Sequence, residues 1–352
     1  PNLESISSYA FANCISLETI DLHENITQLD EGCFSYCSGL TGTINISYIT
    51  TLSSYAFEYC TQISYVVFKS SLNEIGNYAF QHCYNLQNLT FMDSLETIGY
   101  GPFSHCSSLS NISFNRKLYY IRNYAFEYCT SLTRLDFCSL VSIYNYVFQY
   151  CSNIKEIEFD RADKIGDYAF YSCSSIYNLT IGDNVNSIGD YAFRNCTGLE
   201  IITVPENVKC DKCGTGVFYG CTGLKGASQI PDHFTYIPEE YFCECTGIQE
   251  LQIPENITEI KDSAFEHCIS LGSCTIPETV KSIGYKAFFN CSGFQGDLTL
   301  HGDLTLDDKS FAYCTGLKGN LILKSGITLG SYDFAQCTGF TGSLNIVSRG
   351  DN

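Results

Sequence analysis

Five charged residues near the middle of the chain come closest to a catalytic set: Arg134, Asp136, Glu156, Glu158 and Asp160. They alternate with other side chains, which places them on one side of extended segments. Two carboxyl groups that face each other across a sugar can act as the acid and the nucleophile of a glycosidase. That role needs one carboxyl whose pKa is raised by burial, and an open strand surface implies no cleft. We therefore expect a charged, solvated surface that attracts basic partners, and not an enzyme.

Cysteines and histidines offer a second kind of chemistry. Cys210 and Cys213 have the spacing of half a zinc site, but Cys243 and Cys245 are poorly spaced to complete it. We expect free thiols there, with a local disulfide as the alternative, and no metal or cofactor.

Six histidines are scattered along the chain: His23, His82, His105, His233, His267 and His301. Three of them precede cysteines that we expect to be buried, whereas a catalytic Cys–His pair needs an accessible thiolate.

Composition limits the classes of partner. The 38 acidic and 19 basic residues give a formal charge of −19. No basic stripe exists to neutralise phosphates, which argues against nucleic acid and against an anionic membrane surface. No apolar run reaches the ~18 residues that span a bilayer. The charge favours solubility and cationic or neutral partners.

These residues are positioned by a sequence repeat. Phe, two residues, Cys, two residues and then Leu, Ile or Phe recurs fifteen times, from residues 11–17 to residues 334–340. Most steps are 23 residues long, with exceptions of 22, 24 and 25. Such a period predicts one solenoid domain over residues 1–352, with about 15 repeats of 22–25 residues. Because the chain begins inside a repeat without Met, we interpret it as an excerpt of a longer protein.

One repeat shows which elements to expect. In residues 165–181, Ala169, Phe170, Cys173 and Ile176 have the spacing of one face of a short helix or 3-10 turn. The alternation that follows predicts a half-buried strand, and Gly189 later turns the chain into the next repeat. The fold class is therefore an α/β repeat solenoid, with a parallel β-sheet on the concave face and short helical or 3-10 segments on the convex side. The periodic cysteines should be small buried residues, since stacked parallel side chains suit disulfides poorly.

The repeat resembles the BspA-like, or Treponema pallidum-type, leucine-rich repeats. Residues 188–199 carry the motif almost ideally, as Ile-Gly-Asp-Tyr-Ala-Phe-Arg-Asn-Cys-Thr-Gly-Leu. The run at residues 337–346 is similar to forms found in trichomonad surface proteins. Departures are local: Gly101-Pro102-Phe103 and Gly32-Cys33-Phe34 replace Tyr-Ala-Phe, and the step from Cys196 to Cys221 carries extra residues that predict a bulge or kink.

The resemblance implies a recognition protein at the cell surface or secreted. Such a protein would attach to a host cell, to extracellular matrix or to another microbe through a protein or glycan partner. An intracellular scaffold for protein–protein interaction is the alternative. The outward strand positions are the predicted ligand-binding residues: Tyr65, Val67, Asn88, Thr90, Asn111, Ser113, Arg134, Asp136, Glu156, Glu158, Asn178 and Thr180.

Short motifs complete the sequence hypotheses. Among the Asn-x-Ser/Thr sequons, Asn25 and Asn256 lie just beyond predicted strands and are the best candidates for glycosylation. Glycans at Asn88 or Asn111 would instead cover the proposed binding face. Arg349-Gly350-Asp351 matches an integrin-type tripeptide, but a match of three residues is common by chance.

Overall fold

The computed structural model describes residues 3–68, 72–137, 141–159, 161–225 and 230–347. They divide into two compact units, which are described separately. Unit 1 comprises Pro1–Ile176 with Gly182–Val185, and unit 2 comprises Tyr177–Ile181 with Asn186–Asn352. The repeat runs through both units, and a single repeat domain over the whole chain stays a prediction.

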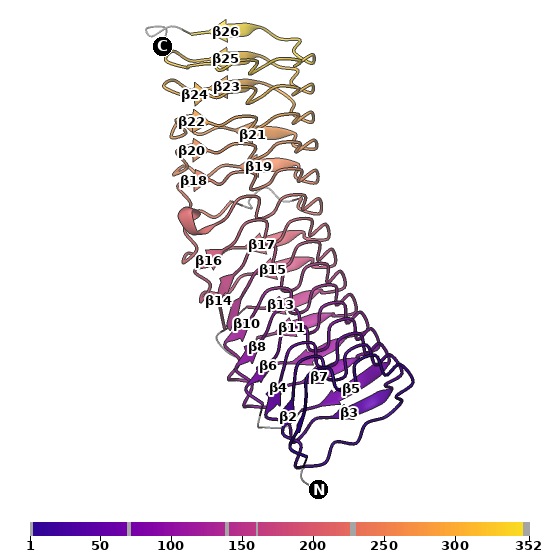
Figure 1. The fold of residues 1–352 in the computed structure, drawn as a ribbon. Helices are drawn as coiled ribbons and strands as arrows, with labels where there is room; N and C mark the ends of the chain where they lie inside the picture. The colour runs from indigo at the N-terminus through magenta and orange to yellow at the C-terminus, as the bar shows by residue number, and fades with distance from the viewer. Residues whose placement is uncertain (1–2, 69–71, 138–140, 160, 226–229, 348–352) are drawn as a thin grey trace. The chain divides into compact units, whose positions relative to one another are not determined.

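Unit 1 contains two ladders of short parallel strands (Figure 1). In both ladders a strand pairs with the strand one repeat later, as in Ser5 with Gln28 and Asn88 with Asn111. The first ladder consists of β3 (Gly42–Asn45), β5 (Ile63–Val67), β7 (Asn88–Thr90) and β9 (Asn111–Ser113), with β11 (Arg134–Asp136) paired to β13 (Glu156–Glu158). The second consists of β1 (Ser5–Ile6), β2 (Gln28–Leu29), β4 (Thr51–Leu52), β6 (Glu74–Ile75), β8 (Thr97–Ile98), β10 (Tyr120–Ile121), β12 (Val141–Ile143) and β14 (Ala162–Ile165).

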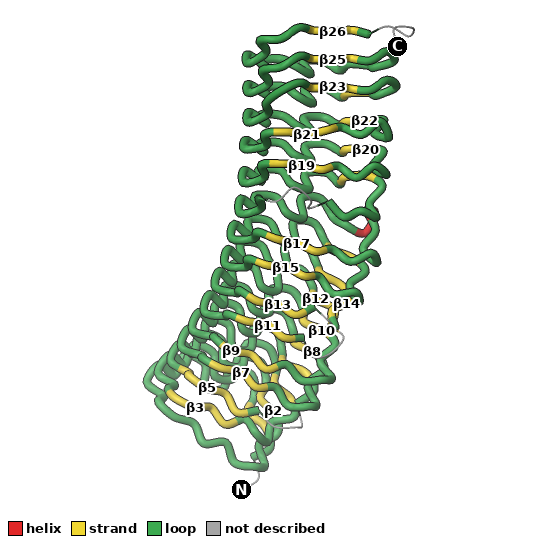
Figure 2. The backbone as a smooth tube through the Cα atoms, turned by 180° about the vertical axis from the view of Figure 1, so that it is seen from behind, coloured by secondary structure: helices red, strands yellow, loops and turns green. Residues whose placement is uncertain are grey.

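Unit 2 repeats this plan (Figure 2), and its paired strands are again parallel. Its first kind of strand comprises β15 (Asn178–Thr180) with β17 (Ile201–Thr203), β19 (Glu250–Gln252) with β21 (Ser273–Thr275), and β23 (Leu298–Leu300) with β25 (Leu321–Leu323) and β26 (Leu344–Ile346). Its second kind comprises β16 (Ser187–Ile188), β18 (Tyr236–Ile237), β20 (Glu259–Ile260), β22 (Ser282–Ile283) and β24 (Thr305–Leu306). Parallel pairing across one repeat confirms the predicted solenoid architecture within each unit.

The predicted helical segment of each repeat is not confirmed, because these residues form two successive β-turns. Glu58 N–H donates to Tyr55 O at 3.1 Å and Cys60 N–H to Phe57 O at 3.2 Å, which closes both turns. The alternate donors, at Tyr55, Phe57 and Tyr59, instead reach carbonyls of the next repeat. Tyr55 and Tyr59 have φ of 60° and 56°, in the left-handed region that ends a right-handed helix. Among described residues, the assigned helix is the 3-10 turn η1 (Cys210–Lys212).

Among the residues that the structure describes, no helix is long and apolar enough to cross a membrane.

The core of each unit is a set of side-chain columns at matching positions in successive repeats. Phe57, Phe80 and Phe103 are fully buried, and their ring centroids are 5.3 and 5.7 Å apart. In unit 2, Phe265, Phe288 and Phe311 stack in the same way at 5.1 and 4.9 Å. Burying a column of rings removes a large apolar area from water, and this burial is the main stabilising contribution.

The periodic cysteines from Cys37 onward form a neighbouring buried column, with a polar role that the sequence did not reveal. Cys106 Sγ donates to the carbonyl of Phe80 at 3.3 Å, and Cys291 Sγ to that of Phe265 at 3.2 Å. The acceptor belongs to the preceding repeat, so each thiol links two turns of the stack. All cysteines that the structure describes are free, as predicted for the column. Burial raises the pKa of Cys83 and Cys291 well above the usual range, so these groups are thiols and not thiolates.

Several repeats have an Ile-Gly pair before the turn segment, and the glycine lies close to the backbone of the preceding repeat. A Cβ placed on Gly76 would lie 2.5 Å from the carbonyl carbon of Ser53, and one on Gly166 would lie 2.5 Å from that of Tyr144. At these two positions the missing Cβ lets the glycine lie close to the preceding repeat, whose equivalent residues are Ser53 and Tyr144.

Candidate functional site

Outward side chains of β5, β7, β9, β11 and β13 form one surface of unit 1, which we call the strand face. The register places Tyr65 beside Asn88 and Arg134 beside Glu156, one repeat apart. Tyr65 and Val67 are each 42% exposed, whereas Leu89 and Leu135 between outward positions are buried. The predicted alternation is therefore present, and ligand binding by this surface stays a prediction.

The polar members of the strand face already contact one another. Tyr65 Oη donates to Gln87 Oε1 at 2.7 Å, and Asn111 Nδ2 donates to Asn88 Oδ1 at 3.0 Å. These cross-repeat bonds reduce the freedom of the outward side chains, so less order has to be imposed when a partner binds.

The described side chains in the charged part of the strand face form an ion pair. Arg134 Nη1 lies 3.3 Å from Glu156 Oε2, and both side chains are more than half exposed. An exposed pair of this kind contributes about 0–1 kcal/mol to stability. The backbones of Asp136 and Glu158 are in β11 and β13, but their side chains and all of Asp160 lie outside the described residues.

Two of the predicted binding residues belong to the other unit. Asn178 and Thr180 are exposed on β15 of unit 2, where they pair with Ile201 and Thr203 of β17. The remaining predicted members, from Tyr65 to Glu158, are all in unit 1. We therefore restrict the strand face, as a site, to unit 1.

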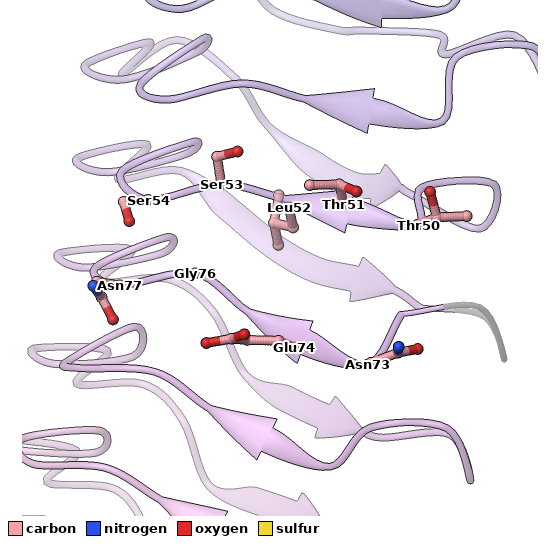
Figure 3. Close-up of a pocket in the computed structure, with 9 residues that line it drawn as sticks. All are labelled: Thr50, Thr51, Leu52, Ser53, Ser54, Asn73, Glu74, Gly76 and Asn77. Carbon is pink, nitrogen blue, oxygen red and sulfur yellow. The ribbon is translucent and has the colours of Figure 1, made fainter.

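A shallow depression of about 440 Å³ lies on the second ladder of unit 1, between β4 and β6 (Figure 3). Its rim carries hydroxyl and amide groups from Thr50, Thr51, Ser53 and Asn77, and Glu74 is the charged residue of its lining. Thr50 Oγ1 is already used, since it donates to Thr27 O at 3.1 Å. The depression offers hydrogen bonds to a ligand, but its lining lacks a pair of groups for acid–base catalysis.

Cys210 and Cys213 do not form part of a metal site among the residues that the structure describes. Both are buried, and the described part of the chain contains no group of three or more potential ligands. Cys210 Sγ accepts the N–H of Thr235 at 3.2 Å, and burial raises the pKa of Cys213. The predicted free thiols are therefore what the structure contains, and the extra residues of this long repeat form η1.

A column of aromatic rings along the turn segments of unit 1 was missed by the sequence analysis. We call it the turn edge of unit 1. Its ring centroids are 4.1–4.6 Å apart, and neighbouring planes differ by 11–24°. The column consists of Tyr36, Tyr59, His82, His105, Tyr128 and Tyr150. All six residues immediately precede a periodic cysteine, and that position was the signal in the sequence.

The centre of this column is a pair of histidines that resists protonation. Their ring centroids are 4.6 Å apart, and Tyr84 Oη lies 3.0 Å from His82 Nδ1. Burial and the charge of His105 lower the pKa of His82, and burial lowers the pKa of His105. Neither histidine lies beside an accessible thiolate, because the adjacent Cys83 and Cys106 are buried. The pair is thus part of the stack and not of a catalytic dyad.

The two candidate glycosylation sites differ in their hydrogen bonding. Asn25 is exposed in a turn. Asn256 is also exposed, but its Nδ2 donates to both Asp232 O and Phe234 O at 2.8 Å, so a glycan there would have to replace one of these bonds. Glycosylation at either residue stays a prediction. Arg349-Gly350-Asp351 lies outside the described residues.

Comparison with known proteins agrees with this architecture. A leucine-rich repeat protein from Bacteroides ovatus ATCC 8483 is 26% identical and superposes with a TM-score of 0.82, over 91% of this chain and 82% of that one. The pneumococcal vaccine antigen PcpA has the same kind of fold, with 15% identity and a TM-score of 0.53, over 99% of this chain and 85% of that one. No curated protein sequence matches the chain.

The family comparison covers most of the sequence. The model of the BspA type leucine-rich repeat region, which holds six copies of the repeat, matches residues 1–108, 73–163, 163–295 and 211–341. These ranges include both ladders, the buried Phe and Cys columns and the turn edge. The chain therefore belongs to the family of BspA-type leucine-rich repeat proteins.

Proposed function

We propose that this protein is a non-enzymatic recognition protein, located at the cell surface or secreted, and that the strand face of unit 1 binds its partner. The partner would be a protein or glycan of a host cell, of extracellular matrix or of another microbe. The observation that carries the proposal is the exposed, internally hydrogen-bonded row that contains Tyr65, Val67 and Arg134. Tyrosine and arginine are the residue types that most often dominate binding energy at interfaces.

The absence of an assembled catalytic group in the described residues supports a non-enzymatic role. Glu156 is paired with Arg134 on an open surface, and the described periodic cysteines other than the exposed Cys14 are buried thiols. The net charge of −19 favours neutral or basic partners over anionic ones.

The proposal is tested by a matched pair of triple variants. The strand-face variant carries Tyr65→Ala, Val67→Ala and Arg134→Ala. The control carries Tyr119→Ala, Tyr120→Ala and Lys117→Ala, which removes exposed aromatic and basic groups at or near β10 of the second ladder. We expect the strand-face variant to lose attachment to cultured cells and to an array of matrix proteins, while the control keeps it. Equal attachment by both variants would exclude the strand face as the binding surface.

An intracellular scaffold is the second candidate, and the free thiols are the observation that favours it. A reducing compartment keeps cysteines in this state, although burial also protects them from oxidation. Labelling of intact cells with a membrane-impermeant biotin reagent separates the two locations. Labelling of the protein in intact cells supports the surface, whereas labelling only after lysis supports the scaffold.

A further inference from the structure

The turn segments of unit 2 line an open hollow. Its volume is about 600 Å³, within the range of small-molecule sites. It extends over three successive repeats, and its lining includes Tyr285, Lys286, Lys309, Tyr313 and Tyr332. The space exists because Ala312 and Ala335 occupy a turn position where neighbouring repeats carry larger side chains such as Phe289.

Two ammonium groups converge on this hollow. Lys286 Nζ lies 5.4 Å and Lys309 Nζ 5.9 Å from the centre of the Tyr285 ring. Lys286 is compensated by Glu266, whose Oε1 is 3.1 Å from its Nζ. Lys309, by contrast, forms no ion pair with any residue in the described ranges. An uncompensated cation beside aromatic rings attracts an anion at short range. The net charge of −19 acts in the opposite direction on the whole chain, so the attraction depends on these local groups.

Two acidic residues near Lys309, Asp308 and Asp333, form hydrogen bonds with other groups. Asp308 Oδ1 accepts the N–H of Ser331 at 2.7 Å. Asp333 accepts hydrogen bonds from Ser310 and from the N–H of Gly330. None of these hydrogen bonds involves Lys309, so its ammonium group is available to a carboxylate of a ligand.

The rings of the hollow present faces as well as edges. Tyr313 is 46% and Tyr332 70% exposed, and Tyr285 is 40% exposed. Tyr313 meets Phe289 at an interplanar angle of 53°, so these two rings do not stack face to face as the rings of unit 1 do. A flat ring with a polar hydroxyl suits a pyranose, which has C–H groups on its face and hydroxyl groups at its edge.

A peptide fits this place less well than a sugar. Extended peptides gain affinity mainly through main-chain hydrogen bonds. The N–H groups of Lys286, Lys309 and Tyr313 already donate to the next repeat, at 3.2, 2.9 and 2.8 Å.

We propose that the hollow on unit 2 binds a sugar that carries a carboxylate, with Lys309 as its ionic partner and Tyr313 and Tyr332 against the pyranose ring. This site lies outside the strand face of unit 1, and the proposal does not depend on the function proposed for the strand face.

The test compares an acidic sugar with its neutral counterpart on the whole chain. The probes are 3′-sialyllactose and a hyaluronan tetrasaccharide, with lactose as the neutral reference, and binding is measured by calorimetry. We expect both acidic probes to bind and lactose to bind about 10- to 100-fold more weakly, because it lacks the charged hydrogen bond. Lys309→Gln should weaken the acidic probes by a similar factor. Lys318→Gln, which removes the same charge from an exposed residue outside the hollow, should leave the affinity unchanged.

Several results would overturn the proposal. If both acidic probes failed to bind at millimolar concentration, the site would be excluded. Equal affinities for lactose and 3′-sialyllactose would also exclude it. Unchanged affinity in Lys309→Gln, with an unfolding midpoint like that of the natural sequence, would exclude Lys309 as the partner. A hexaglutamate peptide that binds more tightly than both sugars, and loses affinity in Lys309→Gln, would replace the sugar by an acidic peptide.

Discussion

The turn edges of the two units have the same backbone and different surfaces. In both, two positions per repeat adopt the left-handed conformation, as at Tyr55 and Tyr59 in unit 1 and at Lys309 and Tyr313 in unit 2. In unit 1 the position before the periodic cysteine carries six consecutive aromatic rings. In unit 2 the corresponding residues are Asn195, Gly220, Glu244, His267, Asn290, Tyr313 and Gln336. The repeat thus determines the path of the chain, while the exposed side chains determine whether its edge is closed or open.

This difference separates a stabilising role from a binding role. Each stacked pair of rings contributes about 0.5–1.5 kcal/mol beyond the burial of its area. Rings that cover one another in this way leave mostly their edges to solvent. Unit 2 lacks this stack, and over three of its repeats the turn segments line a hollow with exposed rings and an uncompensated cation.

The largest expected loss of stability should be common to both units, because it comes from changes in the buried core. Phe103→Ala in unit 1 and Phe288→Ala in unit 2 each remove a fully buried ring from a stacked column. Each should lower the free energy of unfolding by about 3–5 kcal/mol. Urea unfolding followed by circular dichroism measures the loss. A loss below about 1 kcal/mol in either unit would contradict a shared core.

The cysteine column should give a smaller effect, again in both units. Cys106→Ala and Cys291→Ala each remove the S–H donor to a buried carbonyl and leave a small gap. We expect a loss of about 1–2 kcal/mol, because the carbonyl keeps a backbone donor in Cys83 or Cys268. The exposed Cys14 provides the control, and Cys14→Ala should change the urea midpoint little. If all three variants had the same urea midpoint, neither the burial nor the hydrogen bond of the thiols would contribute measurably to stability.

The histidine pair should make the stability of unit 1 depend on pH. The pKa of His82 and of His105 is lowered in the folded state, so the unfolded chain binds protons at a higher pH. Stability should be unaffected by the pair above about pH 6.5 and should fall as the pH decreases below it. The measurement is the urea midpoint at pH 7.5 and at pH 5.5.

The double variant His82→Tyr and His105→Tyr is the control for this effect, since Tyr59 and Tyr128 occupy the same left-handed position. Burial also raises the pKa of Glu58 and Glu127, and their protonation opposes the histidine effect at lower pH. The difference in pH dependence between the natural protein and the double variant isolates the contribution of the two histidines. A pH dependence that persists unchanged in the double variant would assign it to other groups.

The smallest effect on stability comes from a change that makes unit 2 resemble unit 1. Lys309→Tyr places a ring at a position where the next repeat already has Tyr332 with the same φ of 63°. We expect a gain of about 0.5–1 kcal/mol from the added ring contacts. The variant should at the same time lose 3′-sialyllactose binding, because the cation is removed. Retained binding would show that Lys309 is not required for it.

The sequence predicted the parts of the fold that depend on period and burial. Phe57, Cys60 and Ile63 are buried as their spacing predicts, and the strands are parallel across one repeat. The predicted helix was not confirmed because spacings of three residues fit two β-turns as well as a helix. The left-handed positions are held by tyrosine, histidine and lysine and not only by glycine, so the usual signal for such a backbone is missing.

Prediction of the sites was limited by what a strand pattern shows. The alternation identified the outward residues of β5 to β13, since side-chain direction follows from strand periodicity. The ring stack needed the additional knowledge that residues such as Tyr59 and His82 point outward from adjacent turns. The hollow depends on Ala312 and Ala335 lying beside Lys309, and only the spatial structure brings these together.

The bonds between turn segments also determine where the chain tolerates a change of length. In the repeat that spans 25 residues from Cys196 to Cys221, Tyr191, Phe193 and Asn195 still donate to Thr215, Val217 and Tyr219 in the usual order. The surplus residues are accommodated on the opposite side, around η1. Recombination between gene copies could therefore add or remove whole repeats without disturbing the register. Loop grafts for engineering belong at the η1 side, where natural insertion has already been accepted.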